Sequence, residues 1–120
     1  MIDRTKHWYV LDANHQVVPA DDLITWAQFF EKDDARRVAK TQINGLSVST
    51  VFLGLDHSWG GDKPLFFETM IFRDEDNAPP EIYFERIQDW AHDYQTRYTT
   101  WDEAVEGHET VVTIIGEGLF

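Results

Sequence analysis

The chain begins with short apolar runs separated by polar residues. Apolar side chains fill positions 8–11 and 17–18, and the polar segment between them contains Asp12 and Asn14. Asp and Asn accept hydrogen bonds from nearby backbone amides, so they suit tight turns. The pattern predicts a β-hairpin that ends at Pro19.

Two segments repeat apolar residues at intervals of three and four, the spacing of one helix face. The first follows a pair of aspartates that can cap a helix, and it predicts a helix over residues 22–32. The second starts with a Thr-x-x-Glu capping box and predicts a helix over residues 101–115. β-Branched residues lower the helix propensity of its last turns, and we expect the helix to end at Gly116 or Gly118.

Branched and aromatic side chains dominate the middle of the chain and predict β-strands. Runs over residues 36–43 and 46–55 flank an Asn-Gly dipeptide, which is typical of a two-residue hairpin turn. Regular alternation in the first run would place Val38 and Lys40 on the same face of its strand.

A third run, over residues 64–72, is apolar on both faces, so we expect its strand to lie in the middle of a sheet. The composition of residues 73–81 predicts a loop, and alternation over residues 93–99 predicts another strand. Residues 82–91 fit either a helix or a strand.

Together these elements predict an α+β fold with a mainly antiparallel sheet of about five or six strands and two helices. The connections between strands are too short for the crossovers of a parallel sheet. A length of 120 residues is typical of one domain, so we expect a single domain over residues 1–120.

The composition indicates a soluble protein of the cytoplasm. The chain contains no cysteine, which excludes disulfides and thiolate chemistry. Its first ten residues lack the apolar segment of a secretory signal, and no apolar run approaches the ~18 residues of a membrane span.

Acidic residues are concentrated in the second half of the chain. The net charge is −12; residues 1–50 carry seven acids and six bases, whereas residues 51–120 carry fifteen acids and four bases. Such a charge repels phosphates and anionic lipids, which disfavours direct binding to nucleic acid or membranes. We expect a partner with a basic surface.

Three segments, VSTVFLGLDH, LFFETMIF and RYTTWDEAVEGH, resemble a family of small uncharacterised proteins encoded by bacteriophages and prophages. A weaker similarity covers the front of the chain, so the likeness spans most of it. The resemblance implies a phage or prophage origin and no particular activity.

The candidate site residues are polar and aromatic residues of these segments, together with Trp59 from the loop that follows the first segment. We expect binding by Asp56, His57, Trp59, Glu68, Arg97, Tyr98, Trp101 and His108. His57, Glu68 and His108 are the candidates for general acid or base catalysis, because histidine and carboxylate pairs perform it.

Each candidate also has a structural interpretation. Glu68 lies in an apolar run and could be held by Arg97, because a buried carboxylate needs a partner. Asp56 could hydrogen-bond the backbone of its own loop, and His108 could pack on its helix against Trp101. Trp59 stands beside two glycines in a loop, unlike the aromatic residues expected in the core: Trp8, Trp26, Phe29, Phe30, Phe66 and Phe67.

The sequence predicts no metal site and no cofactor. The five histidines are far apart, and no metal-binding spacing such as H-E-x-x-H occurs. An EF-hand over the acidic loop fails because Ala78 and Pro79 occupy positions that need a ligand and a glycine.

Three functions are compatible with these features. The leading hypothesis is a small acidic phage accessory protein that binds a basic surface of a host protein, as a nucleic-acid mimic would, without chemistry of its own. The first alternative is a small-ligand-binding protein or enzyme with a pocket of histidine, carboxylate and arginine. The second is a minor virion or assembly component.

Overall fold

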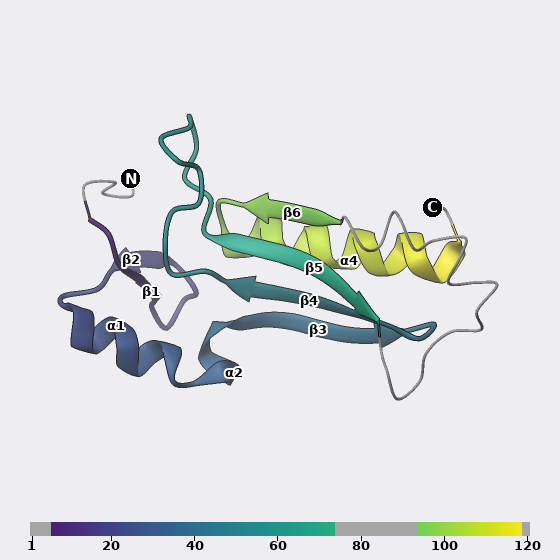
Figure 1. The fold of residues 1–120 in the computed structure, drawn as a ribbon, viewed down its shortest axis with the longest axis horizontal. Coiled ribbons are helices and arrows are strands. Elements are labelled where there is room, and N and C mark those ends of the chain that lie inside the picture. The colour runs from purple at the N-terminus through teal and green to yellow at the C-terminus, as the bar shows by residue number, and fades with distance from the viewer. Residues whose placement is uncertain (1–5, 74–93, 119–120) are drawn as a thin grey trace.

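The computed structural model describes residues 6–73 and 94–118 (Figure 1). Within these residues the strands are β1 (Tyr9–Leu11), β2 (Val17–Pro19), β3 (Arg37–Ile43), β4 (Leu46–Phe52), β5 (Phe67–Arg73) and β6 (Gln95–Tyr98). The helices there are α1 (Leu23–Phe30), α2 (Asp33–Arg36) and α4 (Trp101–Glu117).

The strands form two antiparallel sheets. β1 pairs with β2, and the larger sheet has the order β3-β4-β5-β6. The predicted α+β fold with a mainly antiparallel sheet is therefore confirmed. Two details differ from the prediction: the strands divide into two sheets, and the short helix α2 follows α1. Residues 82–91, and all but the first residue of the predicted loop 73–81, lie outside the described residues.

Local hydrogen bonds shape the N-terminal hairpin and the helix that follows it. Asp12 Oδ1 accepts hydrogen bonds from the backbone amides of Asn14 (2.8 Å) and Gln16 (2.9 Å), which confirms the predicted turn. Asp22 is the N-cap of α1, and its Oδ1 accepts from the Thr25 amide at 2.7 Å. This hydrogen bond lowers the pKa of Asp22. The helix ends at Phe30, two residues before the predicted end.

β5 is an inner strand of the larger sheet, as predicted, because it pairs with both β4 and β6. The turn between β3 and β4 has positive φ at Asn44 (52°) and Gly45 (80°), as a two-residue hairpin turn requires. β4 ends at Phe52 and β5 begins at Phe67, so both strands are shorter than predicted. The residues between them leave the sheet as a loop.

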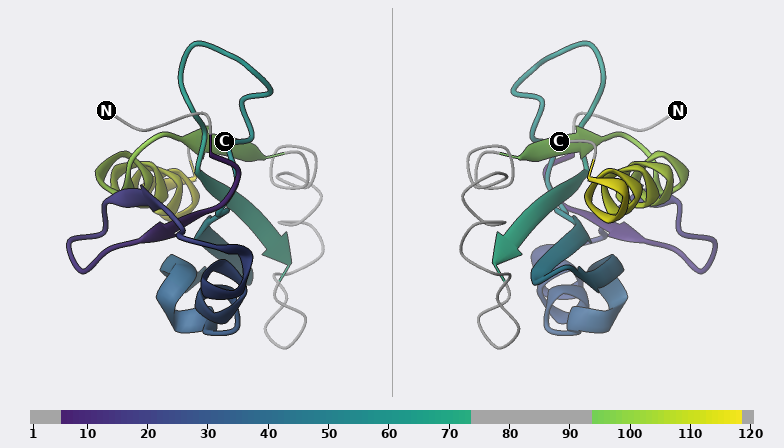
Figure 2. Two further views of the ribbon diagram at one scale, coloured as in Figure 1. Left: turned by 90° about the vertical axis from the view of Figure 1, so that its left-hand side faces the viewer. Right: turned by 90° about the vertical axis from the view of Figure 1, so that its right-hand side faces the viewer.

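α4 covers one face of the larger sheet (Figure 2) and contacts all four of its strands. Its capping box is formed, because the Glu103 amide donates to Thr100 Oγ1 at 3.2 Å. The helix extends beyond residue 115 to its C-cap Gly118, whose φ of 67° is the left-handed conformation typical of a glycine cap. No helix among the described residues is long and apolar enough to span a membrane.

Two apolar clusters and a polar layer form the core on the α4 side of the larger sheet, and the hairpin and α1 also pack against one of the clusters. The buried members of one cluster are Leu46, Val48, Ile71, Val111 and Ile115. Those of the other are Tyr9, Phe52, Phe66, Phe67 and Ala104. Between them, along the same strands and helix, lies the polar layer of Thr41, Thr50, Thr69 and His108. Trp8, expected in the core, is instead 36% exposed.

A β-bulge interrupts the alternation of β3. Arg37 pairs with Val51 and Ala39 with Thr50, so Val38 is the extra residue. Val38 packs against the cluster that contains Phe52, on the α4 side of the sheet. The predicted placement of Val38 beside Lys40 is therefore wrong, because regular alternation does not hold across the bulge.

Candidate functional site

The loop between β4 and β5 carries Asp56, His57 and Trp59, three of the predicted site residues. It projects from one end of the larger sheet (Figure 1). Trp59 is 87% exposed, and its φ of 53° is uncommon for a bulky residue. The loop therefore presents its largest side chain to solvent, away from the core.

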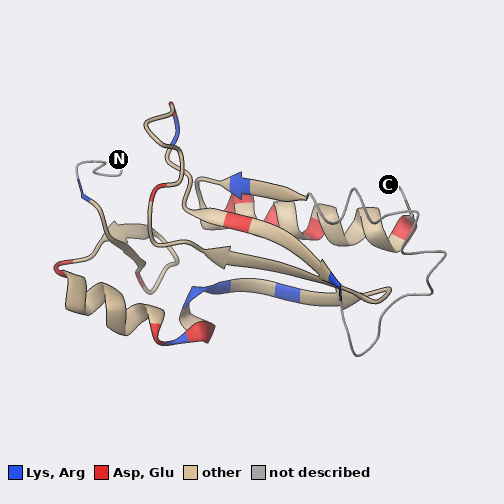
Figure 3. Cartoon of the chain, viewed as in Figure 1, with Lys and Arg blue, Asp and Glu red and all other residues tan. Residues whose placement is uncertain are grey.

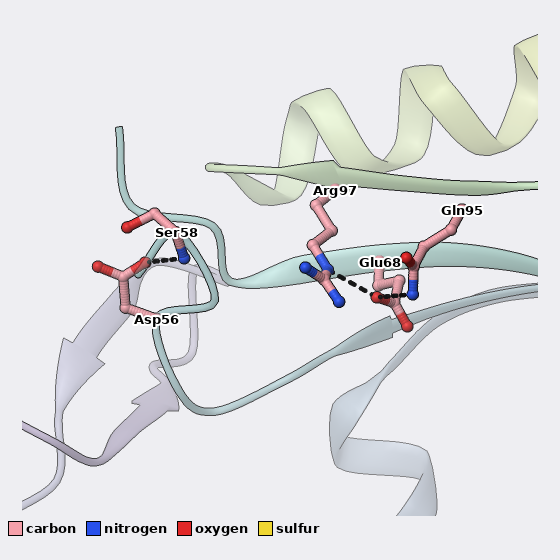
Figure 4. A network of polar contacts seen from close by, with 5 residues as sticks. All are labelled: Asp56, Ser58, Glu68, Gln95 and Arg97. Atoms are coloured by element: carbon pink, nitrogen blue, oxygen red, sulfur yellow. Dashed lines mark hydrogen bonds and ion pairs between the residues drawn. The ribbon is translucent and has the colours of Figure 1, made fainter. Parts of the chain in front are cut away.

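Hydrogen bonds hold the base of this loop. Asp56 Oδ1 accepts from the backbone amide of Ser58 at 2.9 Å (Figure 4) and from that of Leu65 at 2.9 Å. The His57 amide donates to the Leu65 carbonyl at 2.9 Å. The structural interpretation of Asp56 is confirmed, and its carboxylate fixes the conformation from which Trp59 projects.

Trp59 borders an open hollow of about 350 Å³, which we call the Trp59 hollow; it is lined by Lys6, His7, Trp8, Tyr9, Leu55, Asp56, His57 and Trp59. A histidine ring stands edge-on to each tryptophan, with ring centroids 6.0 Å apart for His7 and Trp8 and 6.3 Å apart for His57 and Trp59. Exposed aromatic side chains held in place are typical anchors of protein interfaces. Sequence reasoning missed His7 and Trp8, because no local signal connects them to residues 55–59.

Glu68 and Arg97 form an ion pair on the face of the sheet opposite α4. The two residues are paired in register on β5 and β6, and Arg97 Nε donates to Glu68 Oε2 at 2.8 Å (Figure 4). Gln95 Nε2 donates to the same oxygen at 3.0 Å. The Glu68 side chain is only 11% exposed, so these donors replace the water that it loses. The structural interpretation of Glu68 is confirmed.

We expect Glu68→Gln and Arg97→Gln each to lower the free energy of unfolding by about 1–2 kcal/mol, with a coupling energy of about 1 kcal/mol. The reason is that either change leaves a partly buried charge without its partner. Urea denaturation of the two single variants and the double variant measures the coupling. The exposed pair of Asp33 and Arg36, also 2.8 Å apart, is the control, and its coupling should be smaller. Additive effects for Glu68 and Arg97 would contradict the expectation.

His108 lies on the other face of the sheet, inside the core. It is 4% exposed; its Nε2 is 2.8 Å from Thr41 Oγ1 and its Nδ1 is 2.8 Å from Thr50 Oγ1. Thr50 Oγ1 in turn shares a hydrogen bond of 2.6 Å with Thr69 Oγ1. Burial lowers the pKa of His108, and nearby Glu109 raises it to a smaller extent. Both ring nitrogens have threonine partners, so the geometry gives His108 a structural role in the polar layer.

Tyr98 and Trp101 are also placed by packing. The Tyr98 ring lies directly over Gly107 of α4, in a space that any larger residue at 107 would fill. Burial raises the pKa of Tyr98. Trp101 stacks on His15 of the β1–β2 turn, with centroids 3.8 Å apart and an interplanar angle of 12°. This contact between distant segments was not predicted.

The predicted site residues therefore separate into groups. Asp56, His57 and Trp59 share a loop, and Glu68 and Arg97 lie on one sheet face. The remaining three, Tyr98, Trp101 and His108, pack between the sheet, α4 and the hairpin. Within residues 6–73 and 94–118, no pocket gathers all of them, and no group of three or more His, Asp or Glu side chains is placed to hold a metal ion.

Comparisons of the chain with protein-family models, with curated proteins and with solved structures found no match. The assignment of a function therefore depends on the geometry and charge of the side chains themselves.

Proposed function

We propose that this chain is a phage- or prophage-encoded accessory protein of the host cytoplasm that acts by binding a basic surface of a host protein. The observation that carries the proposal is the outer face of α4. The helix contains five acidic residues and no Lys or Arg, and all five are exposed: Asp102, Glu103, Glu106, Glu109 and Glu117. Figure 3 shows red bands, which mark Asp and Glu, along α4, and blue bands, which mark Lys and Arg, on β3.

A helix fixed to a sheet is a suitable carrier for such a surface. Residues three or four positions apart lie about 5–6 Å from each other on a helix, so Glu106 and Glu109 form one continuous acidic strip. Aligned charges of one sign accelerate encounter with a surface of the opposite sign and exclude partners of the same sign. A phage origin is supported by the sequence resemblance.

The Trp59 hollow supplies the apolar contact that the acidic strip lacks. Charged groups at an interface contribute mainly to encounter rate and specificity, whereas tryptophans often contribute much of the affinity. A host protein that contacted both surfaces would combine fast association with slow dissociation.

The test is affinity for a host protein captured with the wild-type chain. We expect Glu106→Gln with Glu109→Gln to weaken binding about tenfold at about 50 mM salt, and the loss to shrink at about 200 mM. Asp21→Asn with Glu31→Gln removes the same charge from exposed positions near α1 and should leave affinity nearly unchanged. An affinity that does not change with salt concentration, or an equal loss of affinity in both double variants, would contradict the proposal.

A further inference from the structure

Basic residues gather around a hollow at the opposite side of the molecule from the acidic strip. The hollow has a volume of about 230 Å³ and is lined by Asp33, Arg36, Arg37, Lys40, Ser49 and Val51. Three cationic side chains and one carboxylate give this lining a formal charge of +2. This is a local reversal of sign in a chain whose net charge is −12.

The β-bulge of β3 produces this cluster. Arg37 and Lys40 are three positions apart, and in a regular strand they would point to opposite faces. Because Val38 is the extra residue, Arg37 stands opposite Val51 and Lys40 opposite Ser49, and these two β4 residues share one face. The bulge thus brings both cations and the Ser49 hydroxyl to the same face of the sheet. Re-aiming of a side chain is a frequent role of bulges near binding sites.

Two of the three cations have capacity for a further partner. Lys40 is exposed and forms no ion pair among the described residues. Arg37 Nη1 lies 3.6 Å from Asp34 Oδ1, but the Asp34 side chain is 98% exposed, so this pair is weak. Arg36 is held more firmly, because it donates to Asp33 at 2.8 Å and lies 5.4 Å from the centre of the Phe30 ring.

We propose that this hollow, which we call the basic hollow, binds a phosphate group. A guanidinium offers paired N–H donors that match phosphate oxygens, and lysine adds a point charge. The Ser49 hydroxyl is a further donor on the same face. The site is separate from the acidic strip of α4 and from the Trp59 hollow. The protein would therefore bind a second ligand besides the basic partner proposed above.

The competing explanation is protection of a sheet edge. β3 is one of the two outer strands of the larger sheet as described, and lysines and bulges on outer strands prevent pairing with other chains. That explanation requires the charge of Lys40 but no bound anion. The two explanations therefore differ in whether phosphate binds saturably and in whether Lys40 is needed for binding.

The test is titration of the full-length chain with inorganic phosphate at constant pH and ionic strength, followed by amide ¹H–¹⁵N spectra. We expect saturable shifts at the amides of residues 36–40 and 49–51. Lys40→Gln should weaken this binding about tenfold, as expected for loss of one charged hydrogen bond. Lys63→Gln removes the same charge from the loop between β4 and β5 and should leave the affinity unchanged. Arg37→Gln is a second site variant, and urea denaturation checks that each variant is folded.

A second titration uses a single-stranded oligonucleotide. It determines whether the bound phosphate group comes from a free phosphate or from a nucleic-acid backbone. The proposal is supported if Lys40→Gln weakens the binding of either probe while Lys63→Gln does not. The probe that is affected identifies the source of the phosphate group. Shifts that never saturate, equal weakening by Lys63→Gln, or no binding of either probe would overturn it.

Discussion

Replacement of Gly54 by alanine is expected to lower the free energy of unfolding by about 3 kcal/mol, the sum of backbone strain and overpacking. Gly54 has a φ of 74°, a conformation that a residue with a Cβ atom adopts only at a cost. An added Cβ would also overlap the Phe30 ring and would lie 2.8 Å from Trp26 Nε1. Neither aromatic side chain can move freely, because both belong to the packing between α1 and the end of the larger sheet.

Urea denaturation measures the loss, and Gly60→Ala is its matched control. Gly60 also has a positive φ, 86°, but nothing lies within 4 Å of an added Cβ. Its substitution should therefore cost only the strain, about 1 kcal/mol. In a chain that also carries Phe30→Leu, Gly54→Ala should lower the free energy of unfolding by less, because the side chain that the added Cβ overlaps is smaller. Equal losses for the two glycines would show that the contact with Phe30 is unimportant.

Features set by neighbouring residues could be predicted from the sequence. The Asx turn after β1, the Asp22 cap, the Asn-Gly turn between β3 and β4, and the capping box of α4 each depend on residues a few positions apart. Such motifs form through local hydrogen bonds, so the residue pattern alone identifies them. The ion pair of Glu68 and Arg97 was also anticipated, because an apolar strand requires a partner for its carboxylate.

Features set by distant residues could not be predicted in the same way. The bulge at Val38 leaves a continuous β pattern in the sequence, and only the register against β4 reveals it. Trp8 was expected in the core because of its size, yet it borders the Trp59 hollow. The stacking of His15 on Trp101 depends on how the hairpin meets α4. In each case the decisive neighbour comes from another element.

The polar layer is the clearest example of such long-range order. Along β4 the residues facing α4 run from Val48 through Thr50 to Phe52, so a threonine separates the two apolar clusters. On β5 and α4, the polar residues Thr69 and His108 likewise stand between the two apolar clusters. A slide of α4 by one turn would separate His108 from its threonine partners and leave buried polar groups unpaired. The polar layer therefore fixes the register of the helix on the sheet.

His108→Ala is expected to lower the free energy of unfolding by about 3 kcal/mol, because it leaves a cavity and removes a hydrogen-bond partner from two threonines. Thr41→Val is the milder comparison and should cost about 1 kcal/mol, since it removes one hydroxyl without a cavity. Urea denaturation measures both losses. A triple variant, with His108→Leu, Thr50→Val and Thr41→Val, replaces most of the polar layer by apolar groups and should recover much of the stability. If His108→Ala cost no more than Thr41→Val, the polar layer would not determine the register.

The stability of the wild-type chain should also decrease as the pH falls below about 6.5, the ordinary pKa of histidine. Burial lowers the pKa of His108 in the folded state, so the unfolded chain takes up a proton before the folded chain does. Uptake of protons by the unfolded state favours unfolding, and the loss continues until the pH reaches the lowered pKa. Urea midpoints at about pH 7.5 and about pH 5.5 measure this decrease. His108→Gln lacks this titrating group and should show a smaller decrease. An equal decrease in both would mean that His108 is not the group responsible.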